Sequence, residues 1–105
     1  MKRTVSDLAK TDGRVYVYLA DDGIGSRFLR MAEDEGFAFP DGAGPTERQY
    51  AEVMAVNRDR TLNYVGMNGR IAFFAGAKKV GGEKLVRVDF KKYDGGDADY
   101  LYTVG

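Results

Sequence analysis

The segment from Arg58 to Phe74 holds the densest mixture of side chains that could recognise a ligand, because arginines, amides and aromatic rings follow one another closely there. Recognition of a nucleotide needs a ring to stack on the base, an amide or backbone group to read its edge, and guanidinium groups for phosphate. The candidates for these three roles are Arg60, Asn63, Tyr64, Asn68, Arg70, Phe74 and Arg87. The pattern predicts a site for a small anionic ligand. The alternative is that these aromatics fill a sheet and a contact between subunits.

The distribution of charge permits an anion site in the same half of the chain. Residues 58–92 hold nine Lys and Arg against three Asp and Glu, although the whole chain has a net charge of zero. Such a local excess allows anion binding, or it reflects strands that turn one charged face to solvent. With a pI near 6.2 and no helix-turn-helix spacing or aromatic–basic RNA-binding pattern, we expect no nucleic-acid partner.

The residue types that are missing limit the chemistry. The chain has no histidine and no cysteine, which excludes Ser-His and Cys-His nucleophilic sites, zinc fingers and disulfides. Carboxylates at Asp21, Asp22 and residues 33–35 could hold a magnesium ion, but the predicted helix between them spans about 18 Å. We therefore expect a binding protein and not an enzyme, with no catalytic residues, no metal and no cofactor.

Two strong local patterns lie in the first third of the chain. Residues 14–20 are β-branched and aromatic on both faces, which predicts a strand at the centre of a sheet. After a turn at Asp21–Gly23 that offers an N-cap, apolar residues at helical spacing predict a helix over residues 24–35. Gly36 and Phe37 follow as the left-handed C′ residue and the apolar C″ residue of a Schellman-type stop.

The remaining elements are predicted from shorter patterns. A capping box at Thr46 to Gln49 predicts a short helix over residues 46–52. Residues 84–90 alternate between apolar and polar, as is typical of a strand with one buried face, and an aromatic tail follows over residues 98–104.

Three extended runs, 52–57, 61–65 and 70–75, predict an antiparallel meander whose last turn is Asn68-Gly69. In such a meander the adjacent residues Phe73 and Phe74 face opposite sides of the sheet. One of the two rings would then be covered by a helix, a partner subunit or a ligand.

The fold class predicted from these elements is α+β, a single domain over residues 1–105. We expect an antiparallel or mixed sheet of about five strands, one main helix at 24–35 and a short helix at 46–52. No apolar run approaches the ~18 residues of a membrane helix, so we expect no membrane partner. The absence of a signal sequence and of cysteine fits the cytoplasm, which is the host cytoplasm for a phage protein.

Residues 34–42 (acidic-Gly-Phe, then a Gly-rich turn), Pro45-Thr46 and Asn63-Tyr64-Val65-Gly66 resemble a group of small proteins from phages and mobile elements of gut bacteria. The shared outline covers roughly residues 14–75. Some of that group are similar to the anti-Thoeris sponges, phage proteins that sequester cyclic ADP-ribose signals without cleaving them. The resemblance implies an oligomer that binds nucleotides at subunit interfaces, and no binding position is transferred from it.

The leading hypothesis is a homo-oligomeric, non-enzymatic phage or mobile-element protein that sequesters a small anionic (cyclic) nucleotide in a counter-defence role. The alternative is a protein–protein inhibitor or adaptor for a host protein, acting through a sheet edge or the aromatic tail with Tyr93, Tyr100 and Tyr102.

Overall fold

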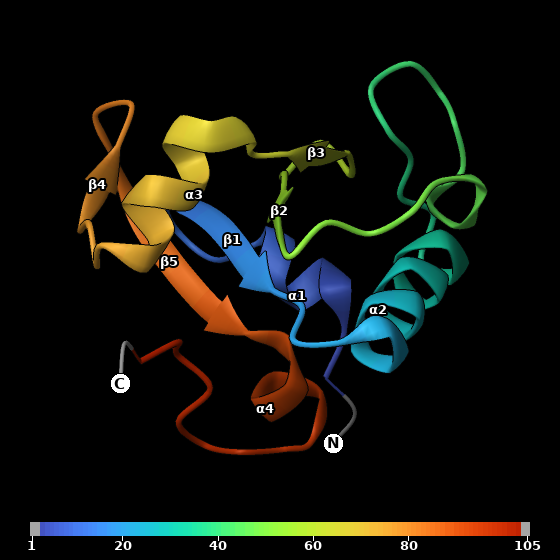
Figure 1. The fold of residues 1–105 in the computed structure, drawn as a ribbon. Coiled ribbons are helices and arrows are strands. Elements are labelled where there is room, and N and C mark those ends of the chain that lie inside the picture. Colours follow the sequence, from blue (N-terminus) through green and yellow to red (C-terminus); the bar gives the residue numbers. More distant parts are fainter. Residues whose placement is uncertain (1–2, 104–105) are drawn as a thin grey trace.

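The computed structural model describes residues 3–103 and is built around a five-stranded mixed sheet with the order β3-β2-β1-β5-β4 (Figure 1). The strands are β1 (Arg14–Tyr18), β2 (Val53–Val56), β3 (Leu62–Tyr64), β4 (Lys79–Val80) and β5 (Glu83–Asp89). β1 pairs antiparallel with β2 and parallel with β5, so it lies at the centre of the sheet as its sequence predicts. The α+β fold class with a mixed sheet is confirmed.

β1 is covered on both faces. Val15 and Val17 point into an apolar cluster on one face, while Tyr16 belongs to a second cluster on the other face. This arrangement explains why the strand carries no solvated face in its sequence pattern.

The main helix, α2 (Asp22–Asp34), begins and ends by local rules. The side chain of Asp21 accepts a hydrogen bond from the first turn, as expected of an N-cap. Gly36 has φ = 86°, and the backbone N–H of Phe37 donates to the carbonyl of Ala32 across 2.9 Å. These contacts form the predicted Schellman stop.

The prediction of a short helix over residues 46–52 is wrong in the length of the element and in the contact that stabilises its start. The structure has only a 3-10 turn, η1 (Pro45–Glu47), and Thr46 lies inside it. The Thr46 backbone N–H and hydroxyl donate to the carboxylate of Glu33, at 3.1 and 2.8 Å. A contact with α2 therefore replaces the predicted capping box.

The third strand of the predicted meander is also wrong. Residues 70–75 belong largely to a helix, α3 (Gly66–Phe74), and Asn68-Gly69 lies within that helix instead of forming a hairpin turn. Gly69 and Phe73, four residues apart, are buried on one side of α3. Because the other side of α3 is also rich in apolar residues, no polar stripe reveals its helical period.

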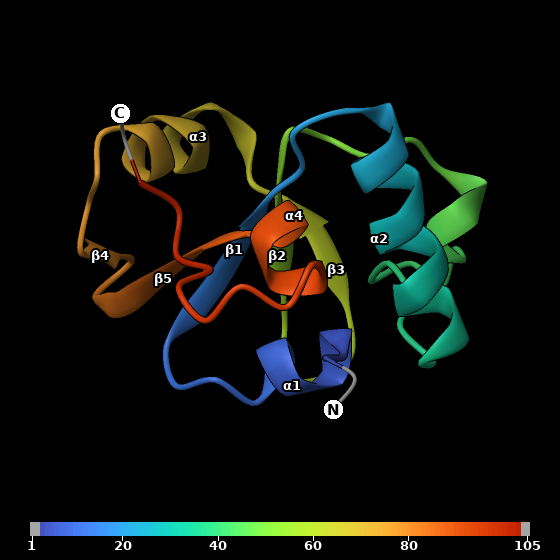
Figure 2. The same ribbon diagram turned by 90° about the horizontal axis from the view of Figure 1, so that it is seen from below.

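Two further helices were not predicted. They are α1 (Val5–Ala9) and α4 (Phe90–Asp94), each only five residues long. Helices this short are marginal alone and depend on tertiary contacts. Helices α1, α2 and α4 contribute to the first apolar cluster, and Phe73 of α3 to the second, which lies on the other face of the sheet (Figure 2).

The aromatic tail packs on both apolar clusters, with Tyr100 against the first and Tyr102 against the second. Tyr102 packs with its ring centroid 4.8 Å from that of Phe73, and Leu101 forms an antiparallel bridge with Val88 of β5. Among residues 3–103, no helix is long and apolar enough to cross a membrane.

Candidate functional site

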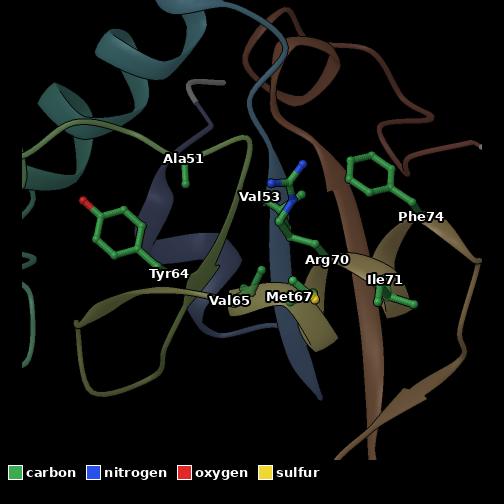
Figure 3. Close-up of a pocket in the computed structure, with 9 residues that line it drawn as sticks. Ala51, Val53, Tyr64, Val65, Met67, Arg70, Ile71 and Phe74 are labelled. Atoms are coloured by element: carbon green, nitrogen blue, oxygen red, sulfur yellow. The ribbon is translucent and has the colours of Figure 1, made fainter.

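A groove of about 650 Å³ lies between α3 and the β2–β3 part of the sheet. Its lining includes Val53, Tyr64, Met67, Arg70, Ile71 and Phe74. Tyr64 and Phe74 lie at opposite ends of the groove, and the Arg70 side chain extends between them over Val53 (Figure 3). Apart from Arg70 and the hydroxyl of Tyr64, these side chains are apolar.

The geometry of α3 produces this surface. Phe73 faces the sheet and is fully buried, whereas Met67 and Ile71, one turn apart, are 78% and 60% exposed. Residues four apart lie on the same helix face, so Met67 and Ile71 form a continuous apolar ridge along the groove. An exposed ridge of this kind is uncommon on a helix whose opposite side already supplies the core.

Arg70 lies in the middle of the groove and is already paired. Its Nη2 lies 2.8 Å from Oε1 of Glu52, and both side chains are about half exposed. A surface pair of this kind contributes little to stability, about 0–1 kcal/mol. Glu52 also balances the charge of Arg70, so the pair adds no net charge to the surface at the groove.

Tyr64, the last residue of β3, is held at two points. Its ring stacks on Phe39 with centroids 5.4 Å apart, and its hydroxyl donates to the carbonyl of Gln49 across 2.7 Å. The side chain nevertheless remains 46% exposed. A tyrosine fixed in this way offers a preorganised apolar face to a partner.

Tyr18 lies in the aromatic cluster next to the groove. Its ring centroid lies 6.1 Å from that of Phe74 and 6.4 Å from that of Phe73. Desolvation, with smaller contributions from nearby acidic groups such as Glu52, raises the pKa of the Tyr18 phenol. The phenol therefore stays neutral at ordinary pH and acts in packing.

Three of the predicted ligand residues, Tyr64, Arg70 and Phe74, come together in this groove. The other four do not. Asn68 lies on α3 and is exposed, outside the groove lining. The Asn63 side chain points to a different hollow, where its Oδ1 accepts a hydrogen bond from Nδ2 of Asn57 across 2.5 Å.

Arg60 and Arg87 serve the fold. Nη1 of Arg60 donates to the carbonyl of Glu35 across 2.7 Å, and the guanidinium lies over the ring of Phe37. Nη1 of Arg87 donates to the carbonyl of Phe73 across 3.1 Å. Both guanidinium groups thus tie together segments distant in sequence, and neither lines the groove.

Met67 and Ile71 are the groove residues that sequence reasoning missed. Their spacing of four, extended by Phe74, would have indicated an apolar face if residues 66–74 had been assigned to a helix. The prediction of a strand over residues 70–75 conceals this helical spacing.

A second hollow, of about 820 Å³, lies near the start of β1 and is polar. It mixes both signs of charge, and its arginines are paired: Arg14 with Glu83 at 2.6 Å, and Arg58 with Asp12 at 3.3 Å. The hydrogen bond that Arg14 donates to the Glu83 carboxylate raises the pKa of Arg14. Paired charges of this kind are more typical of a solvated surface than of a ligand site.

The acidic residues at the start of α2 have structural partners. Asp21 caps the helix, and Asp22 accepts a hydrogen bond from the hydroxyl of Tyr50 across 2.6 Å, which raises the pKa of that phenol. Within residues 3–103, no three acidic side chains gather in a way that could hold a metal ion.

Comparison of the chain with protein-family models, with curated proteins and with solved structures gave no match. The groove and its own residues are therefore the basis on which a function is proposed.

Proposed function

We propose that this protein is a non-enzymatic interaction protein that holds a partner protein in the groove between α3 and the β2–β3 edge. The observation that supports this proposal is the exposure of Met67 and Ile71 beside the half-exposed ring of Tyr64. Contiguous apolar patches on small proteins mark interaction sites, and Tyr, Met and Arg are the residue types enriched at interfaces.

The shape of the groove favours an apolar segment of a protein as its occupant. The ridge of Met67 and Ile71 runs along one wall, and Tyr64 lies at one end. An amphipathic helix docks into grooves of this kind through residues three or four apart. Arg70 and Glu52 would then contact polar groups at the border of such a helix.

The aromatic tail supports this choice of surface. Tyr100 packs against Tyr93 with ring centroids 5.1 Å apart, and Tyr102 packs on Phe73. Because both rings are half-buried in these contacts, they present less free apolar surface to a partner than Met67 and Ile71 do.

A second candidate function is capture of a small anionic nucleotide, because Tyr64, Arg70 and Phe74 do line one groove. The role of a cyclic-nucleotide sponge in counter-defence stays a prediction of this kind. Phosphate binding favours several convergent donors, whereas Glu52 already neutralises the single guanidinium of this groove. For this reason we place the nucleotide second.

Selection from a random peptide library displayed on phage tests the leading proposal. Peptides that bind the wild type are measured again on Met67→Lys/Ile71→Lys and on Asn68→Lys. The last variant adds a lysine to the same helix outside the groove. We expect the double variant to lose binding at least tenfold and Asn68→Lys to retain it. Equal binding to all three proteins would show that the groove is not the site.

Titration calorimetry with a panel of cyclic nucleotides tests the second candidate. If a nucleotide binds in the groove, Arg70→Ala weakens it by about 1–3 kcal/mol while the fold stays intact. No heat with any member of the panel removes the nucleotide hypothesis and leaves the peptide result untouched.

A further inference from the structure

We infer that a second copy of this chain covers the groove when no target is bound, so that the resting protein is a two-fold homodimer joined through α3. This inference rests on the proposed function, since it names what competes with the target for the same surface. Three observations carry it: the shape of the surface, its charges and the protection of the opposite sheet edge.

The surface contains both a ridge and a hollow. Met67 and Ile71 protrude from α3, and the hollow beside them is lined by Ala51 and Val65 and bounded by Tyr64. In a two-fold interface the same patch meets itself, so any protrusion needs a matching hollow on the same patch. Here the ridge of each copy can enter the hollow of the other, so the same apolar contact forms twice in the dimer.

The charges of the patch are also self-complementary. Arg70 and Glu52 lie 2.8 Å apart, so the patch carries one group of each sign. When two copies meet about a two-fold axis, Arg70 of each copy can face Glu52 of the other. A partner of uniform charge would instead meet one like charge, which weakens association.

The opposite edge of the sheet carries features that discourage self-association. β4 is two residues long, and its Lys79 lies directly opposite Lys84 of β5. Both lysines are exposed. Lysines and very short strands at an edge prevent strand pairing between copies. In contrast to the two lysines at this edge, the one charged residue of α3 is Arg70, and Glu52 neutralises it.

Self-association would regulate the groove. A target must displace the second copy, so its apparent affinity falls as the protein concentration rises. The apolar ridge is also kept from unspecific contacts while the target is absent.

Sedimentation velocity over a concentration series tests the inference first. We expect the wild type to approach twice the chain mass of 11.6 kDa at high concentration. Met67→Lys/Ile71→Lys should stay monomeric, and Asn68→Lys should dimerise like the wild type. A wild type that is monomeric throughout, or a double variant that dimerises as tightly, would overturn the inference.

A charge exchange tests the pairing across the two-fold axis. Arg70→Glu and Glu52→Arg should each weaken self-association at least tenfold, because like charges then face one another. An equimolar mixture of the two variants should restore dimers, since the heterodimer joins opposite charges at both positions. Circular dichroism confirms that each variant is folded. A mixture that remains monomeric contradicts this interface.

The two proposals fail in different ways. A monomeric wild type that still binds groove-dependent peptides would refute the dimer and keep the proposed function. A dimer through α3 that no selected peptide competes with would refute the proposed function and keep the dimer.

Discussion

Phe73 and Ile71 lie two residues apart in α3 and on opposite sides of it. Phe73 is fully buried against Tyr18 and Tyr102, whereas Ile71 is 60% exposed. In a helix two residues differ by about 200° around the axis, whereas in a strand they point to the same face. This relationship separates the side of α3 that packs in the core from the side that we propose binds a partner.

The difference between these two residues is measurable. Phe73→Ala should lower the free energy of unfolding by about 3–5 kcal/mol, because it empties a filled core position. Ile71→Ala should change it by less than about 0.5 kcal/mol in the monomer, since the side chain packs against little. Urea denaturation at a concentration that keeps the chain monomeric gives both values. Equal losses would indicate a strand.

The contact between α2 and Tyr50 depends on the absence of a side chain at Gly25. A Cβ at this position would lie 2.3 Å from Cγ of the Tyr50 ring. Gly25→Ala should therefore destabilise the protein by about 1–3 kcal/mol, although alanine is the better helix former. Thermal unfolding of Gly25→Ala and of Ser26→Ala, an exposed neighbour, measures the effect. Stabilisation by Gly25→Ala would show that Tyr50 does not pack there.

A side chain from the end of α2 caps the first helix. The carboxylate of Glu35 accepts hydrogen bonds from the backbone N–H groups of Val5 and Ser6, at 2.9 and 2.7 Å. Glu35→Ala should cost about 1–2 kcal/mol, because it leaves two backbone donors of α1 without their acceptor. Hydrogen exchange should quicken at the amide of Lys10, which donates to the Ser6 carbonyl. The exposed Asp34→Ala is the matched control, and equal effects of both would contradict the cap.

Stability at high pH should depend on Tyr93. Its hydroxyl donates to the carbonyl of Thr4 across 2.6 Å, and burial raises the pKa of the phenol to about 12. The unfolded chain loses this proton near pH 10, so the contribution is complete below pH 10 and falls as the pH rises toward 12. The loss amounts to up to about 2 kcal/mol. Denaturation at several pH values should show a shallower decline for Tyr93→Phe, and parallel curves would exclude this origin.

The features that sequence patterns predicted correctly are local ones. The β-branched and aromatic pattern of residues 14–20 on both faces predicts a central strand, and β1 (Arg14–Tyr18) is central. Asp21, Gly36 and Phe37 mark the ends of α2 because caps depend on neighbours a few residues away. The alternation of residues 84–90 corresponds to β5 except at Phe90, which begins α4.

The candidate site was predicted only in part, since residue types indicate what a side chain can do and not which partner it meets. Arg60 and Arg87 looked as available as Arg70, but the carbonyls of Glu35 and Phe73 occupy them. Those partners come from segments that only folding brings near. Tyr64, Arg70 and Phe74 line the same groove because a helix follows β3 directly.

The sequence by itself determined the α+β class, the central strand and the C-terminal stop of α2, because each follows from neighbouring residues; α2 begins two residues before the predicted start. Tertiary structure alone decided that residues 66–74 form a helix. That segment is apolar on both sides, so its period is hidden, and its conformation depends on burying Phe73 against the sheet. The same burial leaves Met67 and Ile71 exposed to solvent, and the groove is a consequence of it.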